Sequence, residues 1–397
     1  MRFILPIIVI AQFFCTSVWF ASNSIISDIA KELNLAPDFL AHLTSVIQFG
    51  FISGTLVFAI FTISDRFSPS RVFFGSAVLA GLFNLGISIP GIGAAELLVL
   101  RFLTGFFLAG IYPVGMKIAA DYFREGLGRS LGFLVGALVL GKAFPHLLNN
   151  LVQGFPWRYV VYITSALAVT GGLAIFRFVP NGPYRKWSQQ LKFTAFLSGF
   201  RYPKFRSVAF GYFGHMWELY TFWVFVPVML AAYNQRYPEA GLNVSLLSFV
   251  IIGSGTLACV ASGLLSQRFG AKKLATLSLF LSFICCLVSP LFLFAESSLV
   301  LILFLVFWGI VVIADSPLFS TLIAQNAAAE SKGTSLTIVN CIGFSITIIS
   351  IQFINAVAKA LPSTNTCLCC LVLARRWGCW FYSAKRKIPG AYRLCNL

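Results

Sequence analysis

The stretch SDRFSPSR, residues 64–71, decides the fold because a related stretch, SQRFGAKK, recurs at residues 266–273. Each of the two lies between long apolar segments, the second and the third of its series. A further pair, EGLGRSL at 125–131 and ESKGTSL at 330–336, joins the fourth and fifth segments of each series. Two matched pairs at corresponding places predict a chain built from two similar halves.

The composition indicates a membrane protein. Of the 397 residues, 58% are hydrophobic and only 10% are charged, whereas a soluble domain carries about 25% charged residues. Apolar segments of about 20 residues are long enough to cross a bilayer as helices. We therefore predict an all-α, polytopic membrane protein with about eleven spans. These lie near 3–27, 40–63, 72–91, 97–120, 130–151, 157–179, 206–231, 245–266, 274–294, 298–324 and 334–358.

The basic residues indicate the orientation of these spans. With the N-terminus on the cytoplasmic side, most lysines and arginines of the connections fall on that side, and the opposite side holds only Lys31, Arg158, Arg236 and Lys359. Cytoplasmic loops carry such an excess of basic residues, so the net charge of +17 is explained by topology and does not indicate nucleic-acid binding. The predicted organisation is an N-terminal bundle at 1–180, a cytoplasmic linker at 181–205, a C-terminal bundle at 206–362 and a tail at 363–397.

Two motifs of the sequence resemble motifs of a known family. SDRFSPSR resembles the loop signature of the major facilitator superfamily, and Arg101-Phe-Leu-Thr-Gly105 resembles its fourth-span motif. The resemblance extends over about residues 1–360. It implies two six-helix-type bundles related by a pseudo-twofold axis along the membrane normal, the second with only five recognisable spans, and secondary active transport by alternating access.

The resemblance also implies a cytoplasmic latch between helix ends, formed by Asp65, Arg66, Arg71 and, in the second copy, Arg268. A solvated basic loop that serves only topology is the alternative reading. The chain departs from the family pattern at Gln267, which replaces the acidic residue in the second copy. Gly136-Ala137 stands where drug/proton antiporters carry Gly-Pro, which disfavours multidrug efflux.

Ionisable residues within the predicted spans are candidate functional residues, because charges at membrane depth are costly. Lys142 and Glu218 lie near the midpoints of the fifth and seventh spans. His146 follows Lys142 by four residues and His215 precedes Glu218 by three, so each pair shares a helix face. The candidate residues for substrate binding and coupling are Arg101, Lys142, His146, His215, Glu218 and Asp315. Lys117, near the inner end of the fourth span, is expected to extend to the interface.

The basic residues at depth outnumber the acidic ones, which favours a small organic or inorganic anion as the transported solute. Lys142 and Arg101 are expected to attract it. Glu218 or Asp315 is expected to carry a coupling proton, with Glu218 facing the cavity between the halves; an ion pair between Glu218 and Lys142 is the alternative. Efflux of hydrophobic or cationic compounds is a second possibility, which the neighbouring aromatic residues Trp217, Tyr220 and Trp223 would suit. A sensor that binds a solute without moving it is a third.

Other classes of function lack a motif. The chain has no glycine-rich phosphate loop, no metal-binding spacing and no nucleophile motif in its spans. We therefore expect a transporter and not an enzyme, with no cofactor and no metal. Its expected partners are a small solute, protons and the lipid bilayer, with no nucleic acid. The expected location is the plasma (inner) membrane, where the protein would be a monomer.

The tail at 363–397 does not continue the pattern. Its apolar part, 367–374, is too short to span a membrane and is stopped by Arg375-Arg376. The tail also carries five cysteines: Cys367, Cys369, Cys370, Cys379 and Cys395. These features predict a shift of reading frame near residue 363 in place of a twelfth helix. An inactive product of a decayed gene is therefore a further alternative to a working transporter. A tail peculiar to this lineage is the alternative.

Overall fold

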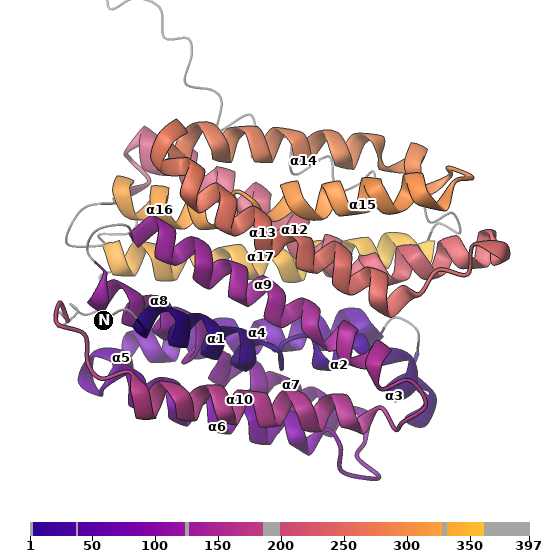
Figure 1. Cartoon of the computed structure of the whole chain (residues 1–397), viewed down its shortest axis with the longest axis horizontal. Helices are drawn as coiled ribbons and strands as arrows, with labels where there is room; N and C mark the ends of the chain where they lie inside the picture. Colours follow the sequence, from indigo (N-terminus) through magenta and orange to yellow (C-terminus); the bar gives the residue numbers. More distant parts are fainter. Residues whose placement is uncertain (1–2, 37–38, 124–126, 186–198, 328–331, 361–397) are drawn as a thin grey trace, which may run out of the picture.

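The computed structural model describes residues 3–36, 39–123, 127–185, 199–327 and 332–360, and every regular element within these ranges is a helix. Figure 1 shows the helices lying side by side in two groups, one formed by the first half of the chain and one by the second. Helices satisfy their backbone hydrogen bonds internally, which a bilayer requires. The predicted all-α, polytopic fold is confirmed.

The described part of the first half contains ten helices. They are α1 (Ile4–Thr16), α2 (Ala21–Ser24), α3 (Ile26–Glu32), α4 (Phe39–Ile60), α5 (Ile63–Arg66), α6 (Pro69–Gly86), α7 (Ala94–Leu108), α8 (Tyr112–Tyr122), α9 (Leu127–Leu151) and α10 (Arg158–Phe178). In the described part of the second half lie α12 (Pro203–Arg236), the short 3₁₀ helix η1 (Pro238–Ala240), α13 (Val244–Phe269), α14 (Ala271–Leu293), α15 (Ser298–Ile313), α16 (Ser316–Asn326) and α17 (Lys332–Ala360).

Within the described ranges, nine helical segments are long and apolar enough to cross a membrane, with α7–α8 and α15–α16 each counted as one. The 18-residue α6 and the 13-residue α1 take the places of the third and first predicted spans. The first prediction, one helix over 3–27, is wrong in detail. The helix stops after Thr16, and a second helix begins at Ala21.

The fourth and tenth spans are each interrupted, and they break at matching places. α7 gives way to α8 around Ala109–Ile111, and α15 gives way to α16 around Ala314–Asp315. Pro113 and Pro317 lie in the first turn of α8 and of α16, where a missing N–H costs nothing because it has no partner within the helix. The matching breaks agree with the repeat seen in the loops.

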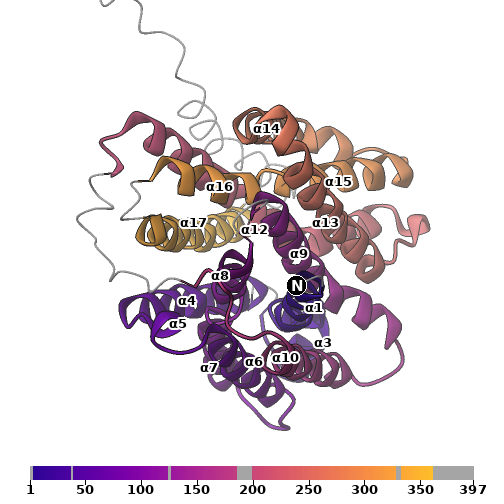
Figure 2. The ribbon, with the colours of Figure 1, turned by 60° about the vertical axis from the view of Figure 1, so that its left-hand side comes forward.

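The two halves meet mainly along two pairs of helices, α9 with α13 and α4 with α17, with smaller contacts of α9 with α16 and of α4 with α12. The views in Figures 1 and 2 place α9 alongside α13 between the two groups. Close approach is possible because Gly136 faces Thr256, whose hydroxyl donates to the Gly136 carbonyl at 3.2 Å. On the other pair, the Gln352 amide donates to the Ser45 hydroxyl at 2.8 Å. Residues between these two contacts lie at the junction of the halves.

The predicted linker and tail are only partly described. α12 begins at Pro203, so the last residues of the predicted linker belong to a helix. The start of the linker packs on the first half, where Ser68 donates to Asn181 at 2.8 Å. The tail at 363–397 and the predicted frameshift lie outside the described residues.

Candidate functional site

Lys142 lies at the junction of the two halves, in a group of aromatic rings that we call the lysine cage: Lys142, Trp19, Tyr220 and Trp223. The Lys142 ammonium is fully buried and lies 3.8, 4.2 and 5.2 Å from the ring centres of Trp19, Tyr220 and Trp223. It also donates a hydrogen bond to the Tyr220 hydroxyl. Aromatic faces attract a desolvated cation. Lys142 and Trp19 come from the first half and the other two residues from α12 of the second, so the cage can form only when the halves meet.

Further rings close the cage. The Phe51 ring of α4 lies 4.9 Å from Trp19, and the Phe344 ring of α17 lies 5.8 Å from Trp19 and 5.3 Å from Tyr220. One turn along the same two helices, Thr347 donates a hydrogen bond to Gln48. The residues around the cage therefore also come from both halves.

The cage contains more hydrogen-bond donors than acceptors. In the described part of the chain, no carboxylate lies within ion-pair distance of Lys142. The indole N–H groups of Trp19 and Trp223 are buried and find no acceptor among the same residues. Buried charges and donors are costly unless they are paired. The cage therefore has one lysine amino group and at least two unused indole N–H groups.

His146 lies on α9, one turn beyond Lys142, and is 3% exposed. The two residues are four apart, so they share a helix face, as the sequence predicts. His146 is thus placed at the junction of the halves but not in the cage itself.

Arg101 is predicted from the sequence to attract the solute, but the structure gives it different partners. Its guanidinium is fully buried and donates to the backbone carbonyls of Val18, at 3.0 Å, and Trp19. These carbonyls lie in the interruption between α1 and α2, where the regular helical hydrogen bonds stop. Asn84 accepts a further bond from Arg101 at 3.3 Å. Arg101 therefore holds the interruption that directs Trp19 into the cage.

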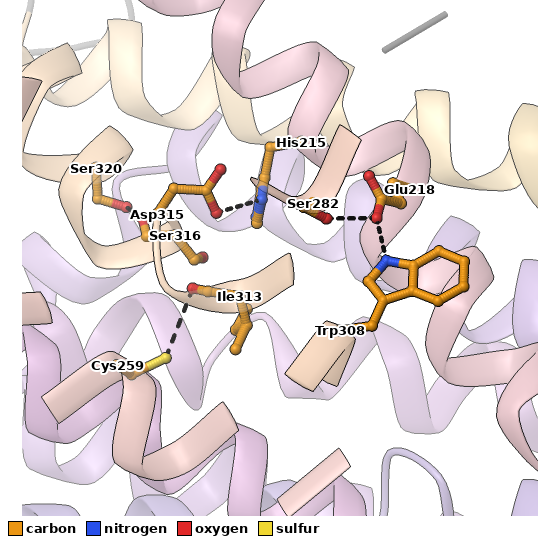
Figure 3. Close-up of polar contacts among 9 residues, drawn as sticks. All are labelled: His215, Glu218, Cys259, Ser282, Trp308, Ile313, Asp315, Ser316 and Ser320. Carbon is orange, nitrogen blue, oxygen red and sulfur yellow. Dashed lines mark hydrogen bonds and ion pairs between the residues drawn. The ribbon is translucent and has the colours of Figure 1, made fainter. Parts of the chain in front are cut away.

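Glu218 is predicted to face the cavity between the halves, but it points into the second half. Its Oε1 atom accepts hydrogen bonds from Ser282 of α14 and Trp308 of α15, both at 2.5 Å (Figure 3). Glu218 and Tyr220 are two residues apart, which corresponds to about 200° around a helix. Because Tyr220 faces the first half, Glu218 must face away from it. Among the residues that the structure describes, Glu218 and Lys142 do not form the alternative ion pair.

His215 and Asp315 are brought together although they are 100 positions apart in the sequence. His215 Nδ1 of α12 lies 2.8 Å from Asp315 Oδ1, and both side chains are fully buried (Figure 3). Asp315 stands where α15 ends and α16 begins. The pair therefore links the seventh span to the interruption in the tenth.

The predicted cytoplasmic latch has other members. Asp65 forms an ion pair with Lys117 of α8, so the Lys117 side chain reaches the loop between the second and third spans. Arg66, Arg71 and Arg268 are exposed, and within the described ranges no ion pair is formed by any of them. Arg185, at the start of the linker, donates to the carbonyls of Asp65 and Phe67 at 2.7 and 3.0 Å. Polar contacts do connect helix ends here, but they join α5 to α8 and to the start of the predicted linker.

Sequence reasoning missed Trp19, Ser282, Trp308 and Lys117 as partners. A tryptophan in the middle of an apolar span is a usable signal, because its N–H needs an acceptor when it is buried. Of the three aromatic residues predicted near Glu218, Tyr220 and Trp223 lie in the cage. Trp217 instead packs on Phe353 of α17, with ring centres 6.0 Å apart.

A family model described as Major Facilitator Superfamily matches residues 8–351. The chain is similar to the ascochitine biosynthesis cluster MFS transporter of Didymella fabae, with 28% identity over 141 residues, 34% of this chain and 26% of that protein. It is also similar to the bicyclomycin resistance protein homolog of Haemophilus influenzae, with 22% identity over 157 residues, 39% of this chain and 38% of that protein. These matches span less than half the length of either relative.

The fold is similar over nearly the whole chain to a solved structure. The crystal structure of the human organic anion transporter MFSD10 (TETRAN) superposes with a TM-score of 0.73, covering 96% of this chain and 99% of that one. The sequence identity of 14% means that this likeness concerns the fold alone.

Proposed function

The chain belongs to the Major Facilitator Superfamily, and on that premise we propose that it is a secondary transporter that moves a small anion across the membrane by alternating access. Members of this fold bind their solutes near the middle of the bilayer, between two similar halves. The family and its fold are those of transporters and not of enzymes.

The lysine cage is the observation that supports an anion. Lys142 is fully buried at the junction of the halves, with no carboxylate of the described chain to compensate its charge. In a low-dielectric site such a charge attracts an anion far more strongly than it would in water. A solute anion would supply the missing counter-charge, and the contacts with the rings stabilise the ammonium while the site is empty.

We propose that proton movement drives this transport, with Glu218 or Asp315 as the carrier. Asp315 stands at the interruption of the tenth span and contacts His215 at 2.8 Å. Protonation of Asp315 would remove its negative charge and weaken this contact, which would free α16 to move relative to α12. Glu218 lies on α12, one turn from His215, and a change of its charge would act on the same helix.

We also propose an orientation, a location and an oligomeric state for the protein. The excess of basic residues in one set of loops supports a cytoplasmic N-terminus. The protein would be a monomer in the plasma (inner) membrane.

Transport by purified protein in liposomes tests the proposal. Labelled phosphate, acetate and benzoate are offered under an inward proton gradient, and accumulation is followed with and without the gradient. We expect at least one anion to accumulate and Lys142→Met to lower its uptake more than tenfold, about the effect of losing a charge-assisted hydrogen bond. The matched control, Lys273→Met, removes an exposed lysine and should leave uptake unchanged.

Lys142→Arg separates a loss of charge from a loss of folding, because it keeps the cation. Uptake that persists in Lys142→Met, or wild-type protein that moves none of the three anions, would contradict the proposal.

Efflux of organic cations is a second candidate that the cage itself favours. Rings that hold a lysine ammonium can also hold a quaternary ammonium ligand. Phenyltrimethylammonium in the same liposomes distinguishes the two. Transport of this cation, increased by Lys142→Met because the tethered ammonium no longer competes for the rings, would favour efflux.

A further inference from the structure

We propose that the solute recognised by the lysine cage is an aromatic monocarboxylate. This inference rests on the proposed anion transport and names the class of anion. Three features of the cage support it: its single charge, its unused indole donors and its rings.

The charge limits the solute to one negative group. Lys142 is the only cation of the cage, and the other three members are Trp19, Tyr220 and Trp223. Arg101, on the neighbouring α7, already donates to the carbonyls of Val18 and Trp19. A dicarboxylate would bring a second charge that nothing at the cage compensates, which is costly in a buried site.

The donors indicate a planar group with two acceptor oxygens. Lys142 donates to Tyr220, whose hydroxyl hydrogen is left to bond an acceptor. The Trp19 and Trp223 N–H groups are buried and have no acceptor within the described ranges. A carboxylate has about four lone-pair sites on two oxygens, enough for the ammonium and an indole together. An uncharged alcohol or amide would leave the charge of Lys142 uncompensated.

The rings indicate that the rest of the solute is aromatic. Trp19, Tyr220 and Phe344 form one continuous group, with Trp19 stacked on Phe344 at an interplanar angle of 26°. Phe20 and Phe51 extend this group on the side of the first half. Aromatic pairs at such separations are more favourable than their buried area alone predicts. A flat ring that enters when the halves separate would replace ring-to-ring contacts by similar ones.

Binding of matched probes to the purified protein tests the inference. Benzoate and cyclohexanecarboxylate have the same charge and nearly the same size, but only benzoate has a π-system. Benzamide keeps the ring and lacks the charge. Dissociation constants come from displacement of labelled benzoate, with labelled acetate as an independent probe of anion binding. We expect benzoate to bind about tenfold more tightly than cyclohexanecarboxylate, the upper range for an aromatic contact, and benzamide not to compete.

Two tryptophans of α12 provide a matched pair of variants. Trp223→Phe keeps a ring in the cage but removes the unused N–H, and it should weaken benzoate binding about two- to tenfold, as expected for one hydrogen bond. Trp217→Phe makes the same chemical change on the face of α12 that packs on Phe353. It should leave the dissociation constant unchanged, and it also reports any general loss of folding.

The possible outcomes distinguish a failure of the aromatic monocarboxylate as the solute from a failure of the proposed anion transport. If acetate and cyclohexanecarboxylate bind as well as benzoate, the aromatic class is wrong and anion transport stands. If Trp217→Phe and Trp223→Phe weaken binding equally, the cage is not the binding site. If no anion binds, both the inference and the proposed function are contradicted.

Discussion

Glu218 and Tyr220 are separated by one residue on α12, yet their polar groups contact different halves of the protein. Glu218 accepts hydrogen bonds from Ser282 and Trp308 within the second half. Tyr220 accepts one from Lys142 of the first half. α12 thus carries Glu218 on one face and a wall of the cage on the other, so a movement of α12 would affect both sites.

Substitutions at these two positions should have different effects. Tyr220→Phe keeps the ring and removes the hydroxyl, so we expect anion affinity to fall about two- to tenfold. Glu218→Gln keeps an acceptor for Ser282 and Trp308 but cannot release a proton, so affinity should stay and the response of uptake to a proton gradient should disappear. Binding and gradient-driven uptake measured on both variants check this. Equal losses of affinity in the two would show that Glu218 reaches the solute.

Loss of Arg101 should act on stability first. Arg101→Met leaves the carbonyls of Val18 and Trp19 without their donor in a buried place, a loss of about 2–5 kcal/mol of unfolding free energy. Arg101→Lys keeps the charge but lacks the forked donors that reach both carbonyls, so it should be only a partial rescue. Thermal unfolding in detergent measures the effect, with exposed Arg201→Met as the control. If the variant had normal stability but lower anion affinity, the result would support the prediction from the sequence that Arg101 attracts the solute.

The His215–Asp315 contact should appear as a coupling energy. Each single change, His215→Gln or Asp315→Asn, disturbs a fully buried pair. The double variant should therefore be more stable than the sum of the two predicts, by about 1–3 kcal/mol. A double-mutant cycle of thermal stabilities supplies the number, and uptake as a function of pH in the same variants should become flatter. Additive effects would show that the two side chains do not interact.

The Asp65–Lys117 ion pair should matter more than the exposed arginines beside it. Its two side chains are 11% and 21% exposed, so solvent screens the pair less than it screens a surface pair. Asp65→Asn and Lys117→Met should each lower stability by about 1–3 kcal/mol, whereas exposed Arg66→Met should stay within about 0.5 kcal/mol. Thermal unfolding compares the three variants. If Arg66→Met lowered stability as much as Lys117→Met does, Arg66 would be a member of the latch, as the sequence predicts.

Stability should decline in acid in part through Glu32, at the end of α3. The Trp157 indole, at 2.9 Å, and the Arg158 guanidinium hydrogen-bond this carboxylate and lower the pKa of Glu32. A lowered folded-state pKa contributes stability above the unfolded value, near 4.3, that is lost as pH falls through the folded value. The contribution is small because the side chain is 38% exposed. Glu32→Gln should therefore flatten the acid limb of stability against pH slightly, and Glu239→Gln, on η1, serves as the control.

The sequence predicts the parts of this protein that depend on composition and repetition. Apolar length indicates the spans, and the paired loops indicate two halves. The direction of Glu218 depends instead on the rotation of α12 about its axis, which the sequence pattern does not fix because α12 buries residues on most of its faces. The interruption after Thr16 has no proline or glycine to mark it. It is held by Arg101, 83 positions away from Val18, and such a contact is visible only in three dimensions.

The division of the lysine cage between the two halves has a consequence for how the protein is made. α9 is synthesised and inserted before α12, so Lys142 enters the membrane when Trp19 is present but Tyr220 and Trp223 are not. A lysine at the centre of a span costs about 2.5–3.5 kcal/mol on insertion scales. Until α12 is inserted, only the apolar residues of α9 offset this cost. The fifth span therefore reaches its final stability only when α12 of the second half has been inserted and supplies the aromatic partners of Lys142.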